Sequence, residues 1–148
     1  RENSRRGWWK NINASPNDCR SSPTTGAISP VFKEKSEKCL SCGSCVMVCP
    51  TCFCFDVQDD VALNLQQGER YRQWDGCMLV DFAAVAGGGN FRKDRESRFR
   101  HRMYRKGKYV WERLGKLGCV GCGRCASACL AEIASPAETF NMLREEMK

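Results

Sequence analysis

The chain has 148 residues, of which 42% are hydrophobic and 28% are charged, and its formal net charge is +7. These values are typical of one soluble globular domain, and they exclude an intrinsically disordered chain. No apolar run approaches the roughly 18 residues that a membrane-spanning helix requires.

The first 38 residues predict an extended N-terminal arm. Turn-forming residues dominate the segments 13–18 and 21–26, where apolar residues show little periodicity. The chain begins with Arg1, and no apolar core of a secretory signal follows in residues 1–15. We expect the chain to be a processed or truncated piece of a longer subunit.

Two cysteine motifs follow the arm, at residues 39–49 and 119–129. Both have the spacing C-x2-C-x2-C-x3-C, which is that of bacterial ferredoxins. A disulfide framework is the alternative for a chain with twelve cysteines, but cysteines this close in sequence pair with one another only under strain. The spacing therefore favours metal binding in the reducing cytoplasm over a secreted disulfide scaffold.

The same spacing predicts which cysteines share a cluster, because the fourth cysteine of each motif binds the other cluster in two-cluster ferredoxins. We expect two [4Fe–4S] clusters, the first held by Cys39, Cys42, Cys45 and Cys129, and the second by Cys119, Cys122, Cys125 and Cys49. Gly43 and Gly123 occupy matching positions, where the loop needs backbone dihedral angles that side chains resist. Zinc is disfavoured, because its sites typically use two C-x2-C pairs.

The spacer between the motifs, residues 55–118, is a long insertion for a ferredoxin. A run of residues from Phe55 to Leu65, a turn at 67–69 and a returning strand at 71–74 predict a β-hairpin. Residues 78–86 are apolar and predict a short buried helix.

A basic run follows, and residues 92–106 predict a helix with one narrow apolar stripe at Phe99 and Met103. Between residues 92 and 116, eleven Lys or Arg stand against three acidic residues. We expect a solvated face, or a face that docks on an acidic partner. On charge alone, the docking hypothesis rests on Arg98, Arg102 and Arg105.

Four cysteines lie outside the motifs: Cys19, Cys52, Cys54 and Cys77. One interpretation is that they are buried, inert thiols, which is common for free cysteine. The other is a third metal centre formed by Cys52, Cys54 and Cys77, with Cys19 or a carboxylate such as Asp56 or Asp75 as a further ligand. No spacing rule decides between the two interpretations.

Residues 135–148 predict a C-terminal helix, because Ser135 and Glu138 form a capping box and Pro136 takes the first helical position. Together, the elements predict an α+β fold. Its centre is a dicluster bacterial ferredoxin-like core at residues 39–134, with the long insertion 55–118 between the two cysteine motifs.

The residues of the motifs and spacer resemble a known family. The matching strings are Cys45-Val-Met-Val-Cys49-Pro-Thr-Cys-Phe-Cys54-Phe-Asp56, Trp74-Asp-Gly-Cys77, Ala86-Gly-Gly-Gly-Asn-Phe-Arg92, the basic run 98–106 and Cys119-Val-Gly-Cys-Gly-Arg-Cys125. Over roughly residues 36–134 the chain resembles the iron–sulfur β subunit of cytosolic sulfhydrogenases and is similar to the A subunit of anaerobic sulfite reductase. Members of that family are usually longer, with an extra N-terminal domain.

This resemblance implies an electron-transfer subunit of an oxidoreductase complex in the cytoplasm of an anaerobe. In such complexes the subunit passes single electrons between a flavin-containing, NAD(P)H-oxidising subunit and a catalytic metal subunit of the hydrogenase or reductase type. It carries out no bond chemistry itself.

Two other functions compete with electron transfer. Nucleic-acid binding is the alternative for the basic segment 92–116, where aromatic residues are interleaved with cations. Two adjacent clusters argue against it, because a purely structural role needs only one. Catalysis by this chain alone is disfavoured, because His101 is its only histidine and lies among arginines.

Overall fold

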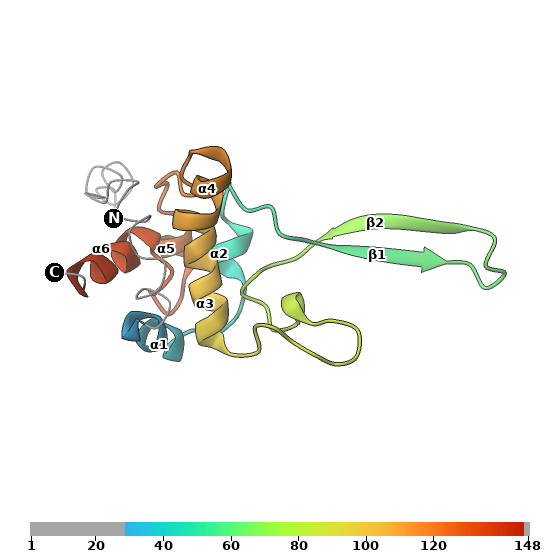
Figure 1. The fold of residues 1–148 in the computed structure, drawn as a ribbon, viewed down its shortest axis with the longest axis horizontal. Helices are drawn as coiled ribbons and strands as arrows, with labels where there is room; N and C mark the ends of the chain where they lie inside the picture. The colour runs from blue at the N-terminus through green and yellow to red at the C-terminus, as the bar shows by residue number, and fades with distance from the viewer. Residues whose placement is uncertain (1–28, 147–148) are drawn as a thin grey trace.

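The structure is a computed structural model, and it describes residues 29–146. Most of the predicted arm and Cys19 therefore lie outside the described residues. The helices gather into one body, from which a two-stranded hairpin projects (Figure 1). The elements in chain order are α1 (Pro30–Glu37), α2 (Ser44–Met47), β1 (Phe55–Val61), β2 (Gly68–Trp74), the 3-10 turn η3 (Asp81–Ala83), α3 (Arg95–Tyr104), the π-helical turn η4 (Arg105–Tyr109), α4 (Val110–Leu114), α5 (Arg124–Ala128) and α6 (Pro136–Glu146).

Helix α1 falls within the residues that the sequence predicted to be an extended arm. Its start has a clear signal: the Ser29 hydroxyl accepts a hydrogen bond from the Val31 N–H at 3.2 Å, and Pro30 occupies the first turn. Val31 and Phe32 are buried, and the Phe32 ring meets the Phe99 ring of α3 edge-on at 6.5 Å. The segment is helical rather than extended because this cap and two apolar anchors dock it on α3.

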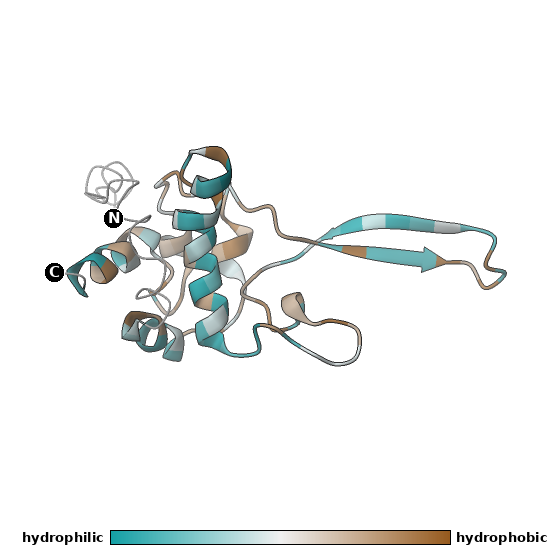
Figure 2. Cartoon of the chain, viewed as in Figure 1, coloured by the Kyte–Doolittle hydropathy of each residue, from teal (hydrophilic) through white to brown (hydrophobic). Residues whose placement is uncertain are grey.

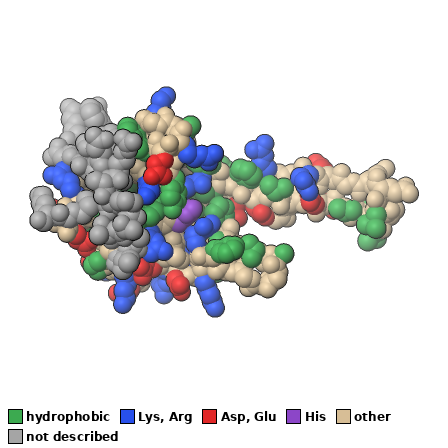
Figure 3. All heavy atoms as spheres, in the orientation of Figure 1, with side chains coloured by type: hydrophobic (Ala, Val, Ile, Leu, Met, Phe, Trp, Pro, Cys, Tyr) green, Lys and Arg blue, Asp and Glu red, His purple; other side chains and the backbone are tan. Residues whose placement is uncertain are grey.

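The predicted hairpin is confirmed. Strands β1 and β2 pair antiparallel from Phe55 opposite Trp74 to Val61 opposite Gly68. Every residue of both strands is exposed, and Figure 2 shows the strands to be mostly hydrophilic. At the free end, where Figure 3 shows hydrophobic side chains on the surface, Leu63 and Leu65 are exposed.

The short buried helix predicted at residues 78–86 is wrong. Only η3 is helical there, and within the segment only Met78 and Ala83 are buried. The chain turns back at the glycines 87–89, where Ala84 forms a β-bridge with Asn90. An apolar run of this length therefore forms a surface loop, since it has no packing partner for most of its side chains.

The predicted helix in the basic run is confirmed as α3, which continues through η4 into α4. Phe99 and Met103 form its apolar stripe and are almost completely buried. They lie in the hydrophobic core with Phe32, Val46 and Met78. Because the same core includes several motif cysteines, α3 is packed directly against the two motifs.

The predicted start of the C-terminal helix is also confirmed. The Glu138 N–H donates to the Ser135 hydroxyl at 3.2 Å, and α6 begins at Pro136. Ser29 donates a hydrogen bond to Glu146, and Lys35 pairs with Glu138, so α6 is tied to the α1 region. Helices and one small sheet together confirm an α+β fold.

Candidate iron–sulfur site

The two cysteine motifs fold in the same way. Gly43 and Gly123 precede the short helices α2 and α5 with φ angles of 75° and 74°. This left-handed conformation confirms that the matching positions need angles that side chains resist. Two residues earlier in each motif, Ser41 and Gly121 also have positive φ, at 53° and 66°. The motif spacing does not predict this conformation at Ser41, where a non-glycine residue is strained.

Arg98 explains how Ser41 is held. It is buried, and it donates to the Ser41 hydroxyl at 3.0 Å and to the carbonyls of Arg92 and Lys93. Arg95, one turn earlier on α3, donates to the Cys39 carbonyl at 2.9 Å. Two arginines of the basic run therefore anchor the first motif to α3.

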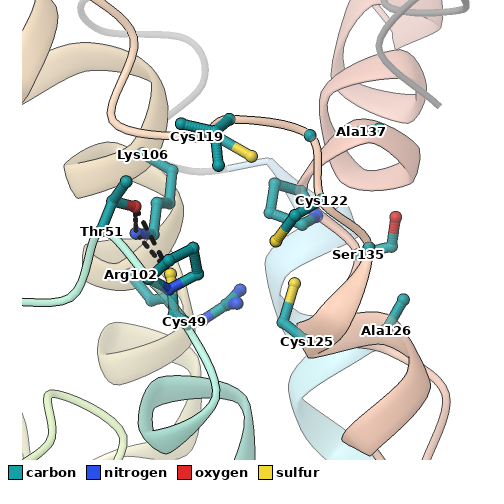
Figure 4. Close-up of a pocket in the computed structure, with 15 residues that line it drawn as sticks. Cys49, Thr51, Arg102, Lys106, Cys119, Cys122, Cys125, Ala126, Ser135 and Ala137 are labelled. Carbon is teal, nitrogen blue, oxygen red and sulfur yellow. Dashed lines mark hydrogen bonds between the residues drawn. The ribbon is translucent and has the colours of Figure 1, made fainter. Parts of the chain in front are cut away.

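Each of two cavities is lined by four of the eight motif cysteines. One, which we name the second-motif cavity, is lined by Cys119, Cys122, Cys125 and Cys49 (Figure 4). The other, the first-motif cavity, is lined by Cys39, Cys42, Cys45 and Cys129. Each cavity thus combines three cysteines of one motif with the fourth cysteine of the other. Helices α2 and α5 pack against each other, which brings the two motifs together.

The walls of the two cavities differ. Among the described residues, the first-motif cavity is lined by no charged side chain, and apolar groups such as Met78, Phe99 and Ile133 face it. The second-motif cavity is lined by Arg102 and Lys106. Burial raises the pKa of Cys45 in the first-motif cavity to about 11, and it also raises the pKa of Cys119 in the second-motif cavity.

Lys106 reaches a motif cysteine directly. Its ammonium group donates to the Cys49 sulfur at 2.9 Å and to the Thr51 hydroxyl at 2.7 Å (Figure 4). Burial alone would raise the pKa of Cys49, but the hydrogen bonds from Lys106 and Thr51 outweigh it and lower that pKa. Lys106 therefore stabilises the thiolate form of Cys49, which is the form that binds metal.

Arg102 lies one helical turn before Lys106 and is only 2% exposed. Its Nη1 donates to the Ala134 carbonyl at 3.1 Å, whereas its buried Nη2 has no hydrogen-bond partner among the described atoms. Although burial opposes the charged form, the sulfurs of Cys45 and Cys125 raise the pKa of Arg102. In Figure 4 its guanidinium group points into the space between Cys49 and Cys125.

These positions correct the expected role of the basic run. A solvated or docking face is wrong for Arg98, Arg102 and Lys106, because all three are buried against carbonyls, hydroxyls and cysteine sulfurs. Arg105 instead stacks over the Phe53 ring at 3.9 Å. Three of the eleven cations that the nucleic-acid alternative counted are therefore turned into the protein.

Three of the four cysteines outside the motifs come together at a third cavity. It is lined by Cys52, Cys54 and Cys77 with Arg102, Arg105 and Lys106. A hydrogen bond with Cys54 lowers the pKa of Cys77. A hydrogen bond with Cys54 also raises the pKa of Cys52. The Cys54 thiol therefore contacts both of the others, so the three thiols lie together.

The further ligands considered for a third centre do not line this cavity. Asp56 is exposed, and the carboxylate of Asp75 accepts a hydrogen bond from the Gly76 N–H. Cys19 lies outside the described residues. Within residues 29–146, no three or more His, Cys, Asp or Glu side chains surround a point that could hold a single metal ion.

His101 is half-buried and has no arrangement suited to acid–base chemistry. Burial, with Arg92 and Arg105 nearby, lowers its pKa to about 4, so the imidazole is neutral at pH 7. Its ring lies 5.9 Å from the Tyr109 ring, centroid to centroid.

Comparisons with known proteins point to the same chemistry. Residues 38–133 match the family described as "4Fe-4S dicluster domain". Over 105 residues the chain is 46% identical to the sulfhydrogenase 2 subunit beta of Pyrococcus furiosus, an alignment that covers 71% of this chain and 30% of that protein. The chain thus spans about a third of that relative's length. The resemblance to sulfhydrogenase β subunits is confirmed, and no solved structure matches the chain.

Proposed function

The chain belongs to the 4Fe-4S dicluster domain family and holds two [4Fe–4S] clusters, and on this premise we propose that it relays single electrons between other subunits of a larger redox complex. Each bound cluster supplies one-electron chemistry and neither makes nor breaks substrate bonds. The crossed grouping of cysteines at two adjacent cavities is the observation that carries the proposal. It supports two clusters close enough for electrons to pass between them.

The proposal includes the ligands. The first cluster takes Cys39, Cys42, Cys45 and Cys129, and the second takes Cys119, Cys122, Cys125 and Cys49. Four thiols per cavity are the donor set that such clusters require. The unpartnered Nη2 of Arg102 supports the same placement, because a buried guanidinium group needs an acceptor and cluster sulfur is one.

The other parts of the chain serve these ligands. Residues 39–134 form the ferredoxin-like core with the insertion 55–118, and α6 in the segment 135–148 covers one side of it. Helix α3 of the insertion supplies buried cations, and Phe99 of its apolar stripe lines the first-motif cavity. In this proposal the insertion belongs to the cluster environment rather than forming a separate unit.

The partners we propose are a flavin-containing, NAD(P)H-oxidising subunit as donor or acceptor and a catalytic metal subunit at the other end. The relative in Pyrococcus furiosus is itself named as a subunit, which supports a multi-subunit complex. A cytoplasmic location is part of the proposal, and in the described part of the chain none of the eleven cysteines is in a disulfide. None of the described helices has the length and apolarity needed to cross a bilayer.

A third centre at Cys52, Cys54 and Cys77 is the finer part of the proposal. Its support is the shared cavity and the three cations around it, which would offset the charge of thiolates bound to iron. We propose that Cys19 or a residue of a partner subunit supplies the remaining ligand of this third centre.

Iron and acid-labile sulfide per chain, measured anaerobically with EPR after dithionite reduction, test both parts. About eight irons with two interacting signals are expected from two clusters, and about ten to twelve from a third centre. Cys42→Ser and Cys122→Ser are expected each to change the signal of one cluster, and Cys77→Ser to change iron content only if the third centre exists. Zinc in place of iron would overturn the proposal.

A further inference from the structure

The two cysteine cavities have matching backbones but different electrostatic walls. Gly43 and Gly123 have φ angles within one degree of each other, and each cavity has four cysteines in the same spacing. Of these two cavities, only the second-motif cavity is lined by cations, within the part of the chain that the structure describes. The two cavities therefore have similar backbones but different electrostatic environments.

The cations are fixed rather than mobile. Lys106 is 8% exposed and is held by Cys49 and Thr51, while Thr51 donates in turn to the Gly118 carbonyl at 2.7 Å. Arg102 is held by the Ala134 carbonyl. Because neither cation is opposed by a carboxylate in the salt bridges of the described residues, their charge is directed at cysteine sulfur.

A positive charge close to an iron–sulfur centre favours the reduced form, which carries one more negative charge than the oxidised form. Net charge and hydrogen bonds to the sulfurs are among the factors that set the potential of such a centre. The effect is larger in a buried site than in water, because the local dielectric constant is lower. The apolar wall of the first-motif cavity has the opposite effect, since it disfavours added charge.

We propose that Lys106, with Arg102 beside it, makes the centre in the second-motif cavity the higher-potential centre of the two, so that an electron shared by both resides mainly there. This inference rests on the proposed function and its ligand assignment. The transfer is balanced: one electron leaves the first centre and arrives at the second, and no proton or bond changes. The electron itself comes from the donor subunit or, in the test, from dithionite.

Lys106 and Arg102 are expected to differ in selectivity. Lys106 contacts Cys49, a ligand of the second centre alone, so its charge acts mainly there. Arg102 lines both the second-motif cavity and the third cavity, so its charge is shared between them. Removing Lys106 should therefore lower the potential of the second centre more than removing Arg102 does.

The test is an EPR-monitored redox titration of the anaerobically purified protein. Cys42→Ser and Cys122→Ser, at matching motif positions, assign each potential to its centre. Lys106→Met is expected to lower the potential of the second centre by at least 59 mV, which is a tenfold change in its one-electron equilibrium constant. The equilibrium constant of the first centre should change by less than twofold. Lys106→Arg, which keeps the charge, is expected to restore most of the difference.

Lys108→Met is the matched control, because Lys108 lies in the same π-helical turn but pairs with Glu112 at 3.7 Å. It should move neither potential. Should Lys106→Met fail to take up iron, Lys106→Gln, which keeps a donor without the charge, has to show the same fall. Equal potentials in the wild-type chain, or an equal shift at both centres in the lysine variant, would overturn the inference.

Failure of the proposed function looks different. A wild-type chain with far fewer than about eight irons, or without EPR signals after reduction, would remove the premise. Two intact centres with potentials in the reverse order would leave electron relay in place and overturn only the role of Lys106 and Arg102.

Discussion

The cysteine-bearing core and the β1–β2 hairpin are stabilised in opposite ways. In the core, side chains such as Phe32, Phe99 and Met103 are almost completely buried. In the hairpin, all residues of both strands are exposed, and the strands are joined by their backbone ladder. Burial of a segment therefore depends on what the rest of the chain brings to it: α3 has α1 as a packing partner, whereas the two strands pair only with each other.

The hairpin is long for a two-stranded sheet without a packing layer, since isolated hairpins are only marginally stable in water. Cross-strand side chains provide its additional contacts: Arg70 forms a two-point pair with Asp59, and Arg72 lies over the Phe55 ring at 5.2 Å. We therefore expect changes in the core to have large effects and changes in the hairpin small ones.

Removal of the iron is expected to have the largest effect. Helices α2 and α5 have four and five residues, too few to be stable without packing, and they hold cysteines around both cavities. Because metal binding and folding are coupled in such sites, the iron-free chain should lose its cooperative thermal transition and much of its helical circular dichroism. An iron-free chain that melts at the original midpoint would contradict this.

Phe99→Ala is expected to have the next largest effect. Phe99 is 1% exposed and packs against Phe32, so its truncation should cost about 3–5 kcal/mol of unfolding free energy. The matched control is Phe91→Ala, because Phe91 is 80% exposed, and a change of about 0.5 kcal/mol or less is expected. Anaerobic urea unfolding followed by circular dichroism measures both; equal losses would mean that the burial is wrong.

Local sequence patterns predicted the secondary structure correctly wherever contacts within the segment determine it. The capping box at Ser135, the helix with Phe99 and Met103 on one side and the hairpin are all confirmed. The prediction for residues 78–86 was wrong because an apolar composition is compatible with a buried helix, but most of these side chains have no packing partner. The prediction of an extended conformation for the last residues of the arm was wrong because these residues do have a partner: Phe32 packs on α3, a long-range contact that the local pattern does not reveal.

The site shows the same limit. Cysteine spacing predicted the donor residues, and the structure places them at two cavities in the crossed grouping. Charge counting, in contrast, treated Arg98, Arg102 and Lys106 as surface residues, although they are buried. A signal existed: Arg98, Arg102 and Lys106 are spaced four apart beside the apolar pair Phe99 and Met103, so they share one side of the helix. When no buried hydrogen-bond acceptor is known, that pattern predicts charged residues on the surface.

Arg98 and Arg102 cannot be used to test docking by charge reversal, because both are buried. A Glu at either position would be a buried, unpaired carboxylate, so loss of a complex would report misfolding.

Shortening the hairpin is expected to have a small effect on the core. Asp56 and Gln73 lie directly opposite each other, so residues 57–72 can be replaced by an Asn-Gly turn. Iron content and EPR signals should be unchanged, and the thermal midpoint should move by no more than about 2 °C. A loss of iron would show that the hairpin supports the cavities, and would remove the distinction between the two regions.

The smallest expected effect concerns the ion pair of the hairpin. Hydrogen bonding and charge from Arg70 lower the pKa of Asp59, as seen in the paired geometry of Nε and Nη2 with the two carboxylate oxygens. A carboxylate with a depressed pKa stabilises the fold above its unfolded pKa, and this contribution is lost as the pH falls through the folded value. Because both side chains are exposed, the effect on stability should be barely measurable and weaker still in 1 M salt.

The pKa itself is nevertheless a sharp probe of register. A slip of one residue would move Asp59 to the opposite face of the hairpin from Arg70. In Arg70→Met, an NMR titration should therefore show the pKa of Asp59 rising towards its ordinary value, while iron content stays constant. An Asp59 pKa that is the same in both chains would mean that the strands pair in another register, and that the exposed hairpin lacks the order that its ladder implies.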